Sequence, residues 1–351
     1  MTVDQERLDR LMGKVVDELG GALGVGLIVV GERAGLWAAL AGAGPMTSEG
    51  LAERSATDER YAREWLRAMA AAGYADYAPG DDTYAISDEV AFAMADPAGP
   101  TVPGACQVVL GALEATGRVA DRFASGEGLG WHEHHHDLFE GTERFFRPQY
   151  AAHLVDEWIP ALDGVGGVLA EGARVADVGC GHGASTILMA EAFPASTFTG
   201  FDYHDASIAH AREAARAAGV DDRVTFAVAP ADAFPGSGYD LVAMFDCLHD
   251  MGDPAAVAAH VRDALAPDGA WMVVEPMAGD RVEDNLNPVG RLFYAASTLV
   301  CTPASLSQDG RAALGAQAGE AALTEVIRRG GFSRVRRATE TPVNIVLEAR
   351  P

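Results

Sequence analysis

The residues best suited to binding chemistry are three glycines that follow a short apolar segment. The segment 174–178 leads into Gly179, Gly181 and Gly183. Glycine allows a sharp backbone turn and lets the chain approach a ligand without a Cβ in the way. The helix expected from Ala184 adds free N–H groups and the positive end of its dipole. Such a turn is typical of a site for a nucleotide-like molecule that carries a carboxylate or a phosphate.

A carboxylate follows at a distance along the chain that suits the same ligand. Asp202 ends the next expected strand, 19 residues after Gly183, where it can accept hydrogen bonds from both hydroxyls of a ribose. The run from Gly179 to Ala184 also satisfies the G-x-G-x-x-G/A fingerprint of dinucleotide-binding enzymes. An NAD-dependent oxidoreductase is therefore one alternative that these residues leave open.

An acidic residue before the glycines extends the pattern. Asp177 lies two positions before Gly179, which gives D-x-G-x-G-x-G. This resembles motif I of the class I S-adenosylmethionine-dependent methyltransferases. The turn 265–269, Leu-Ala-Pro-Asp-Gly, is similar to the L-x-P-G-G turn of that family and departs from it at Asp268. The resemblance covers about residues 170–350 and implies S-adenosylmethionine as cofactor, with S-adenosylhomocysteine as its product.

The resemblance also implies which residues hold the cofactor. Asp177 would hold its amino-acid end through water or the backbone, and Asp232 with Ala233 would contact adenine. Tyr150 would cap the sulfonium side and Arg147 would pair with the cofactor carboxylate, although a plain packing helix explains these two equally well. The full expected set is Asp177, Gly179, Cys180, Gly181, Gly183, Asp202, Tyr203, Asp232, Ala233, Phe245, Tyr150 and Arg147.

A histidine after the fourth expected strand is the candidate general base. The segment 245–251, Phe-Asp-Cys-Leu-His-Asp-Met, resembles the L-H-D-W segment of dimeric small-molecule O-methyltransferases, whose histidine takes a proton from the acceptor hydroxyl. Methyl transfer is an in-line displacement, so a hydroxyl acceptor must be aligned and deprotonated. We predict that His249 is this base, and a histidine that only packs over the cofactor is the alternative. O-methylation is favoured, whereas N- or C-methylation would make the base dispensable.

Four of the ten histidines fall within positions 132–136. Clustered imidazoles bind transition metals, but on a helix only His132 shares a face with His135 or His136. We expect a polar segment at the mouth of the acceptor pocket. A metal site of His132, His135 and His136 is the open alternative.

The acceptor pocket is expected beneath a long insertion. Residues 276–319 separate the fifth expected strand from the helix 321–329 and are too many for an ordinary connection, so they should form a helical lid or pocket wall. The expected acceptor residues come from the histidine segment, the helix after it, the strand ends and this lid: His135, His136, Phe146, Asp246, Glu275, Phe293, Tyr294 and Thr298.

The first part of the chain has the pattern of a winged helix. Helical segments precede 74–77 and 83–86, which are expected to form a two-stranded hairpin. Arg60, Arg63 and Arg67 recur on one face of an expected helix, as in a DNA-reading helix, so a DNA-binding regulator that senses S-adenosylmethionine is a second alternative. Acidic residues in the same helix favour a solvated or dimer-facing helix. The resemblance to dimeric methyltransferases implies a homodimer.

From residue 173 onward, expected strands alternate with helices, which predicts a parallel sheet with helices on both faces. Seven strands are expected, at 174–178, 197–202, 224–228, 239–245, 270–274, 332–337 and 344–349. The fold class is α/β with a doubly wound, Rossmann-like domain at 169–351 and its lid at 276–319. A mostly α winged-helix and dimerisation domain at 1–100 and a helical connector at 101–168 precede it.

Charge and composition limit the partners. With 51 acidic and 26 basic residues the net charge is -25, which repels nucleic-acid phosphates and anionic lipid. Asp4, Glu6, Asp9 and Asp17 stand where a secretory signal would be apolar, and no apolar run reaches the ~18 residues of a membrane span. We therefore expect a cytoplasmic enzyme that acts on a small-molecule acceptor and binds neither membrane nor nucleic acid.

Overall fold

The structure, a computed structural model, describes residues 2–351 and divides into two compact units. The first unit comprises the chain up to Leu110 together with Glu140–Pro148, and the second comprises Gly111–Phe139 and Gln149–Pro351. Helices α6 (Val102–Glu114) and α8 (His136–His153) contribute residues to both units. The domain boundaries expected at residues 100 and 168 stay predictions.

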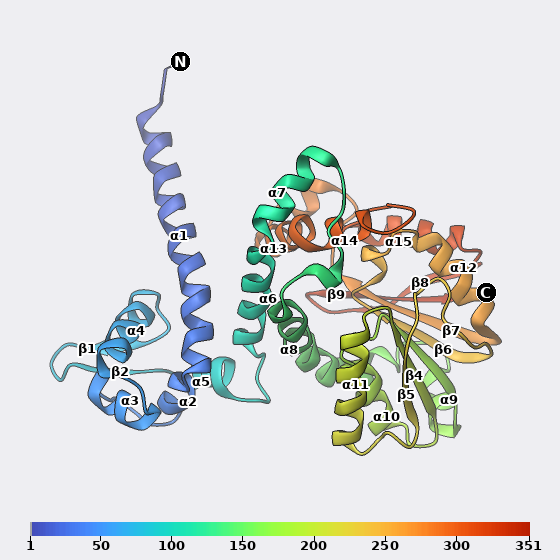
Figure 1. Ribbon diagram of the computed structural model, residues 1–351, viewed down its shortest axis with the longest axis horizontal. Coiled ribbons are helices and arrows are strands. Elements are labelled where there is room, and N and C mark those ends of the chain that lie inside the picture. The colour runs from blue at the N-terminus through green and yellow to red at the C-terminus, as the bar shows by residue number, and fades with distance from the viewer. Residues whose placement is uncertain (1) are drawn as a thin grey trace. The chain divides into compact units, whose positions relative to one another are not determined.

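The first unit has the element order of a winged helix (Figure 1). The hydroxyl of Thr47 accepts the Gly50 N–H at the start of one helix, and the carboxylate of Asp58 accepts the Arg60 N–H at the start of the next. These caps satisfy N–H groups that a helix leaves without partners. The three helices and the wing expected from the sequence are confirmed as α2 (Leu36–Leu40), α3 (Ser48–Ser55), α4 (Glu59–Ala71), β1 (Asp76–Ala78) and β2 (Thr83–Ala85). A further helix, α5 (Asp88–Ala95), follows the wing.

The longest helix, α1 (Gln5–Arg33), precedes the helices of the winged-helix pattern. Its last turns are packed, because the indole N–H of Trp37 donates to the Ile28 carbonyl and that of Trp65 donates to the Leu27 carbonyl. Gly31 is needed there, since a Cβ on it would lie 2.5 Å from the Trp65 ring. The earlier turns of α1 expose large apolar side chains, namely Leu11, Met12, Val16, Leu19 and Leu23.

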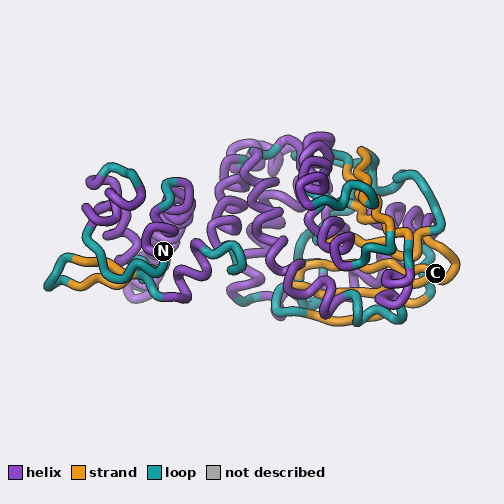
Figure 2. The backbone as a smooth tube through the Cα atoms, turned by 90° about the horizontal axis from the view of Figure 1, so that it is seen from below, coloured by secondary structure: helices purple, strands orange, loops and turns teal. Residues whose placement is uncertain are grey.

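The second unit is built on a seven-stranded sheet with the order β5-β4-β3-β6-β7-β9-β8. The five strands from β5 to β7 are parallel, and β9 pairs antiparallel with β7 and β8. Figure 2 shows the strands of this sheet gathered together among helices. The strands are β3 (Arg174–Val178), β4 (Thr197–Asp202), β5 (Val224–Val228), β6 (Tyr239–Phe245), β7 (Leu265–Pro276), β8 (Arg334–Glu340) and β9 (Asn344–Arg350).

Seven strands are confirmed, and β7 is longer than expected. It begins at Leu265, which pairs with Tyr239 of β6, whereas the next pair joins Leu241 and Ala270. The Pro-Asp-Gly turn lies between these two pairs and forms an irregularity within the strand. The middles of β6 and β7 are buried without interruption, as for strands covered on both faces. Trp271 lies in this core and packs on Phe332 at 5.2 Å between ring centres.

Helices occupy the connections of this sheet and the long insertion. The insertion is helical as expected, with a 3-10 turn at Val282–Asn285, α13 (Pro288–Ala296), a π-helical turn at Ser297–Cys301 and α14 (Thr302–Leu306). The other helices of the unit are α7 (Thr116–Ser125), a 3-10 turn at Trp131–Glu133, a π-helical turn at Leu154–Trp158, α9 (Val165–Glu171), α10 (Ala184–Ala192), α11 (Asp205–Ala218), a 3-10 turn at Leu248–Asp250, α12 (Pro254–Ala264) and α15 (Gly319–Arg329). Within residues 2–351, no helix combines the length and apolar character needed to cross a membrane.

The strand order places a switch point at β3. This strand has β4 on one side and β6 on the other, so the connections from β3 and β6 leave in opposite directions. In open α/β sheets a ligand binds outside the carboxyl ends of the strands at such a point. The glycine turn after β3, Asp202 at the end of β4 and the segment 246–250 after β6 all lie at this edge.

Candidate active site

The glycine turn after β3 has the backbone geometry that glycine permits. Gly179, Gly181 and Gly183 have φ values of 75°, 51° and 83°, which L side chains rarely adopt. A Cβ on Gly179 would lie 2.7 Å from the Cys247 sulfur, and one on Gly183 would lie 2.6 Å from the Phe226 ring. A Cβ on Gly181 would meet no heavy atom within 4 Å. The outer glycines are therefore needed for packing, whereas open space adjoins the middle one.

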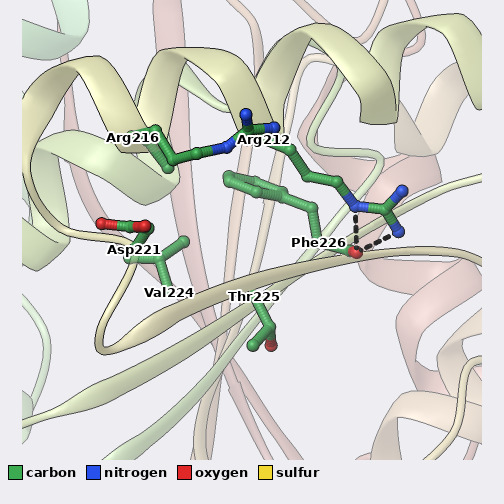
Figure 3. Close-up of a pocket in the computed structure, with 7 residues that line it drawn as sticks. Arg212, Arg216, Asp221, Val224, Thr225 and Phe226 are labelled. Carbon is green, nitrogen blue, oxygen red and sulfur yellow. Dashed lines mark hydrogen bonds between the residues drawn. The ribbon is translucent and has the colours of Figure 1, made fainter.

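Arg212 of α11 holds the backbone of Phe226, the residue whose ring lies against Gly183. The guanidinium of Arg212 donates to the Phe226 carbonyl oxygen at 3.1 and 2.7 Å. Figure 3 shows these two residues beside a cavity of about 250 Å³ between α11 and β5. The cavity is lined by Arg212, Ala215, Arg216, Asp221, Val224, Thr225 and Phe226, and it contains none of the residues predicted to bind cofactor or acceptor.

Asp177 is fully buried near the end of β3, and only one of its two carboxylate oxygens accepts hydrogen bonds within residues 2–351. Its Oδ2 accepts hydrogen bonds from the hydroxyls of Ser185 and Thr186, both at 2.6 Å, while its Oδ1 has no hydrogen-bond partner within residues 2–351. Burial raises the pKa of Asp177 to about 6. A buried oxygen without a partner is costly unless water or a ligand satisfies it. This geometry fits the expected role of Asp177 at the amino-acid end of the cofactor.

Asp202 lies beside the open glycine. Its Oδ2 accepts the Gly181 N–H at 3.0 Å, and its Oδ1 accepts the His204 N–H at 2.9 Å. Burial raises the pKa of this carboxyl. Each carboxylate oxygen has a further lone pair, so the group can still accept from two ribose hydroxyls. The adjacent Tyr203 is half exposed, and its hydroxyl accepts the His132 N–H at 3.3 Å.

Residues expected at the adenine and carboxylate ends are more exposed. Asp232 and Ala233 lie on the surface after β5, and Cys180 is buried in the glycine turn. Phe146 and Arg147 belong to the first unit, where Phe146 packs edge to face on Phe145 at 4.9 Å between ring centres and Arg147 is exposed. Their roles toward cofactor or acceptor stay predictions.

The end of β6 brings together three residues of the expected set. The Tyr150 hydroxyl donates to Oδ2 of Asp246 at 3.1 Å, and the Tyr150 ring packs on Phe245 at 5.1 Å between centres. Asn344 of β9 donates to Oδ1 of Asp246 at 2.8 Å. Asp246 has a φ of 50°, which is uncommon outside glycine and marks local backbone strain. Burial, followed by the charge of Glu275, raises the pKa of Asp246 to about 8.

His249 is buried in the 3-10 turn after β6, where only 3% of it is exposed. Its Nδ1 forms a short hydrogen bond with Oε2 of Glu275, whose Oε1 accepts the Leu248 N–H at 2.8 Å. On the other side of the ring, Nε2 lies 3.1 Å from Oδ1 of Asp250. Glu275 therefore fixes both the ring and the turn that carries it. Sequence reasoning placed Glu275 in the acceptor pocket and missed this contact.

The charge of His249 is set by its neighbours. Burial lowers the pKa of the imidazole, but the negative charges of Glu275 and Asp250 outweigh burial and hold the pKa well above its usual value. A carboxylate on each ring nitrogen thus favours the protonated ring. His249 must lose that proton before its Nε2 can accept one from an acceptor.

The remaining residues expected to contact the acceptor lie in the insertion 276–319 and in the histidine segment. Phe293 and Tyr294 are partly buried on α13, and the exposed Thr298 donates its hydroxyl proton to the Tyr294 carbonyl at 2.8 Å. The rings of His135 and His136 are 4.0 Å apart between centres. The structure brings these residues into the second unit, and contact with an acceptor stays a prediction.

The histidine segment divides into separate environments. Nδ1 of His135 accepts the Asp137 N–H at 3.2 Å and so caps α8, and possible ligand atoms of His135, His136 and Asp137 lie within 4.8 Å of one another. His132 instead contacts Tyr203, with 3.4 Å between Nδ1 and the phenol oxygen. Burial lowers the pKa of His134 to about 4. The polar segment that we expected at the pocket mouth stays a prediction, and a metal site of His132, His135 and His136 stays its alternative.

The arginine face of α4 is largely neutralised. Arg60 pairs with Glu64 at 2.5 Å, and Arg63 pairs with Glu59 at 2.6 Å. A helix that reads DNA must present its arginines to phosphates and bases. Two of the three arginines are engaged within the helix itself, which favours the solvated helix over the DNA-reading one.

Two family descriptions match the chain. Residues 169–329 match a methyltransferase domain, and residues 21–95 match an Rv2258c-like winged HTH domain. The first match contains the glycine turn, Asp202 and the His249 segment, and the second contains the helices and hairpin of the wing. The methyltransferase match decides against the NAD-dependent alternative.

Curated relatives match part of the chain. The 27-O-demethylrifamycin SV methyltransferase of Amycolatopsis mediterranei (strain S699) is 30% identical over 195 residues, which are 55% of this chain and 62% of that protein. The acetylserotonin O-methyltransferase of Mus musculus is 32% identical over 182 residues, which are 50% of this chain and 43% of that protein. The match thus spans less than two thirds of the length of these relatives.

Solved structures resemble the whole chain. Mitomycin 7-O-methyltransferase MmcR has a TM-score of 0.72 at 21% identity over 99% of this chain and 100% of that one. Human N-acetylserotonin methyltransferase in complex with SAM has a TM-score of 0.68 at 17% identity over 100% and 99%. These likenesses show the fold. Together with the matched domains, they show that the chain has a methyltransferase domain that follows an Rv2258c-like winged-helix domain in the sequence.

Proposed function

We propose that the chain transfers the methyl group of S-adenosylmethionine to a hydroxyl of a small molecule, with His249 as general base. The observation that carries this proposal is the buried pair of His249 and Glu275 at the end of β6, the strand next to the one that bears the glycine turn. A carboxylate on Nδ1 orients an imidazole and leaves Nε2 to exchange a proton.

Each residue of the site has a separate task. The bound cofactor supplies an electrophilic methyl group on a sulfonium. Asp177 and Asp202 hold and orient the two ends of the cofactor, since one has a spare buried oxygen and the other adjoins the open glycine. In the neutral ring Nδ1 keeps its proton and donates it to Glu275, so Nε2 is free to take the proton of the acceptor hydroxyl. Tyr150 and Asp246 form the buried wall next to this position.

A small-molecule acceptor is supported by the relatives and by the lid. The names of the two curated relatives give 27-O-demethylrifamycin SV and acetylserotonin as their acceptors. The insertion after β7 is helical, and its α13 carries partly buried aromatic rings. Such walls suit a partly aromatic acceptor better than a macromolecule.

The test compares His249→Ala with the wild-type enzyme on a panel of phenols and alcohols, with transfer of a labelled methyl group as readout. We expect turnover to fall by about 10²–10⁴-fold, the usual contribution of a positioned base, and binding of S-adenosylhomocysteine to persist. His260→Gln serves as control, because His260 lies on α12 and bonds only to the Phe234 carbonyl among the described residues. Normal turnover of His249→Ala would contradict the role of His249 as general base and favour an amine or carbon acceptor.

We also propose a homodimer in which the exposed stripe of α1 packs against a second copy. Met12, Val16, Leu19 and Leu23 recur at intervals of four, three and four residues and are 51%, 64%, 62% and 74% exposed. This spacing is that of a coiled-coil seam. Burial of such a stripe against an identical one removes apolar surface from water on both chains.

The oligomeric state of Leu19→Glu tests this proposal by light scattering of the full chain. We expect a shift from dimer to monomer, because the substitution places two carboxylates in the seam. Gly21→Glu adds the same charge on the opposite side of α1, where a Cβ meets no heavy atom within 4 Å. A monomeric wild type, or a dimer that survives Leu19→Glu, contradicts the proposal.

A further inference from the structure

A third side chain adjoins His249 and Asp250. Cys301 ends the π-helical turn of the insertion and is 8% exposed. One ring nitrogen of His249, one carboxylate oxygen of Asp250 and the sulfur of Cys301 all lie within 4.8 Å of one another. The lid thus brings a sulfur to the nitrogen and oxygen that follow β6.

These three atoms are the donor types that bind zinc in proteins. Ligand atoms around a tetrahedral Zn²⁺ lie about 3.3–3.8 Å apart, given bonds of about 2.0–2.3 Å. Nε2 of His249 and Oδ1 of Asp250 are 3.1 Å apart, which is close to this spacing. We propose that His249, Asp250 and Cys301 bind one Zn²⁺ ion and leave its fourth position open.

Two further observations support this site. Glu275 holds Nδ1 of His249, which is the carboxylate–histidine arrangement that directs the opposite nitrogen toward a metal. Oδ1 of Asp250 has no hydrogen-bond partner in the described part of the chain. A bound cation satisfies this oxygen.

The site has a consequence for catalysis that rests on the proposed function. Nε2 of His249 has one lone pair, which binds either an ion or the proton of an acceptor. Bound zinc therefore occupies Nε2 of His249 and lowers the rate of methyl transfer. Mg²⁺ prefers oxygen ligands and avoids thiolate, so it is expected neither to bind here nor to inhibit.

The test uses the full chain after removal of metals with a chelator, without cofactor or acceptor. Co²⁺ is the probe, because it takes the same ligands as zinc and a bond to thiolate adds a charge-transfer absorption in the near ultraviolet. We expect one equivalent to bind with this absorption and to be displaced by Zn²⁺. Cys301→Ser should abolish the absorption, and Glu275→Gln should weaken zinc affinity about 10–100-fold through loss of ring orientation.

Two control variants locate the ion. Cys106→Ser should keep the absorption, because Cys106 lies in the first unit. His136→Ala should also keep it, since His136 belongs to a different cluster. Absence of the absorption, its survival in Cys301→Ser or its loss in His136→Ala overturns the site. The titration contains no acceptor, so a failure of the methyl-transfer proposal leaves its result intact, and a failure to bind zinc leaves the base assignment of His249 untouched.

Discussion

Replacement of Glu275 by glutamine tests whether the hydrogen bond from Glu275 orients His249 as the proposed base. One carboxylate oxygen of Glu275 accepts the Leu248 N–H and the other accepts Nδ1 of His249. Glutamine keeps one acceptor oxygen and has an NH₂ donor in place of the other, so one of the two donors loses the oxygen that it faces. If that oxygen stays on Leu248, the NH₂ group faces Nδ1 and favours the tautomer with its proton on Nε2. In this tautomer Nε2 has no lone pair for the proton of the acceptor.

The size of the effect follows from the role of the base. A positioned general base contributes about 10²–10⁴-fold to a rate, which is about 2.7–5.5 kcal/mol of activation free energy. We expect kcat of Glu275→Gln to fall within this range, while its affinity for S-adenosylhomocysteine stays near that of the wild type because Asp177 and Asp202 are unchanged. Loss of the Glu275 charge also removes a main cause of the raised His249 pKa. Residual activity should therefore appear at lower pH.

The assay is single-turnover transfer of a labelled methyl group across a pH series, with calorimetry of S-adenosylhomocysteine binding in parallel. Glu320→Gln is the matched control, because Glu320 forms an ion pair with Arg337 on the surface and has no place in the site. Exposed ion pairs contribute about 0–1 kcal/mol, so this variant should retain activity. A kcat of Glu275→Gln equal to that of the control would refute the argument that Glu275 orients the base.

Three further predictions follow from the same geometry. The wild-type kcat should rise with pH through a midpoint above about 6.5, the ordinary histidine value, because the raised pKa of His249 keeps the ring protonated at lower pH; a flat pH profile speaks against the base. Asp202→Asn should raise the Kd of S-adenosylhomocysteine about 10- to 100-fold in calorimetry through the loss of charged hydrogen bonds, and an unchanged Kd removes Asp202 from the ribose site. Gly183→Ala should cost about 1–3 kcal/mol of stability in thermal unfolding, since its Cβ meets Phe226 in a strained conformation. Gly181→Ala should unfold at a higher temperature than Gly183→Ala and lose cofactor affinity instead, and equal unfolding of the two contradicts this distinction.

Much of the second unit could be predicted from local patterns. The bounds of β3, β4, β5 and β6 agree with the expected ones, because apolar runs between glycine and polar turns reflect strands buried on both faces. The bounds of β7 do not, since the turn before it pairs with β6 as an irregular extension. Local propensity does not encode such pairing between strands.

The helix α1 shows a different limit. Its first turns contain the spaced apolar residues of an amphipathic helix, yet these side chains contact no core of the described chain. Without a packing partner in the chain, the pattern by itself does not show what the stripe covers. The winged-helix order was predictable because Thr47 and Asp58 are local caps whose effect needs only neighbouring residues.

The sequence by itself determined the glycine turn, the carboxylate of Asp202, the strands that carry them and the histidine after β6. Each of these depends on steric rules and periodicities that act over a few residues. Only the tertiary structure decided the surroundings of His249. Glu275 ends a neighbouring parallel strand and Cys301 ends a turn of the lid, so their contacts with His249 depend on strand order and on the path of an insertion. Such contacts join residues far apart in the chain, and no short-range pattern records them.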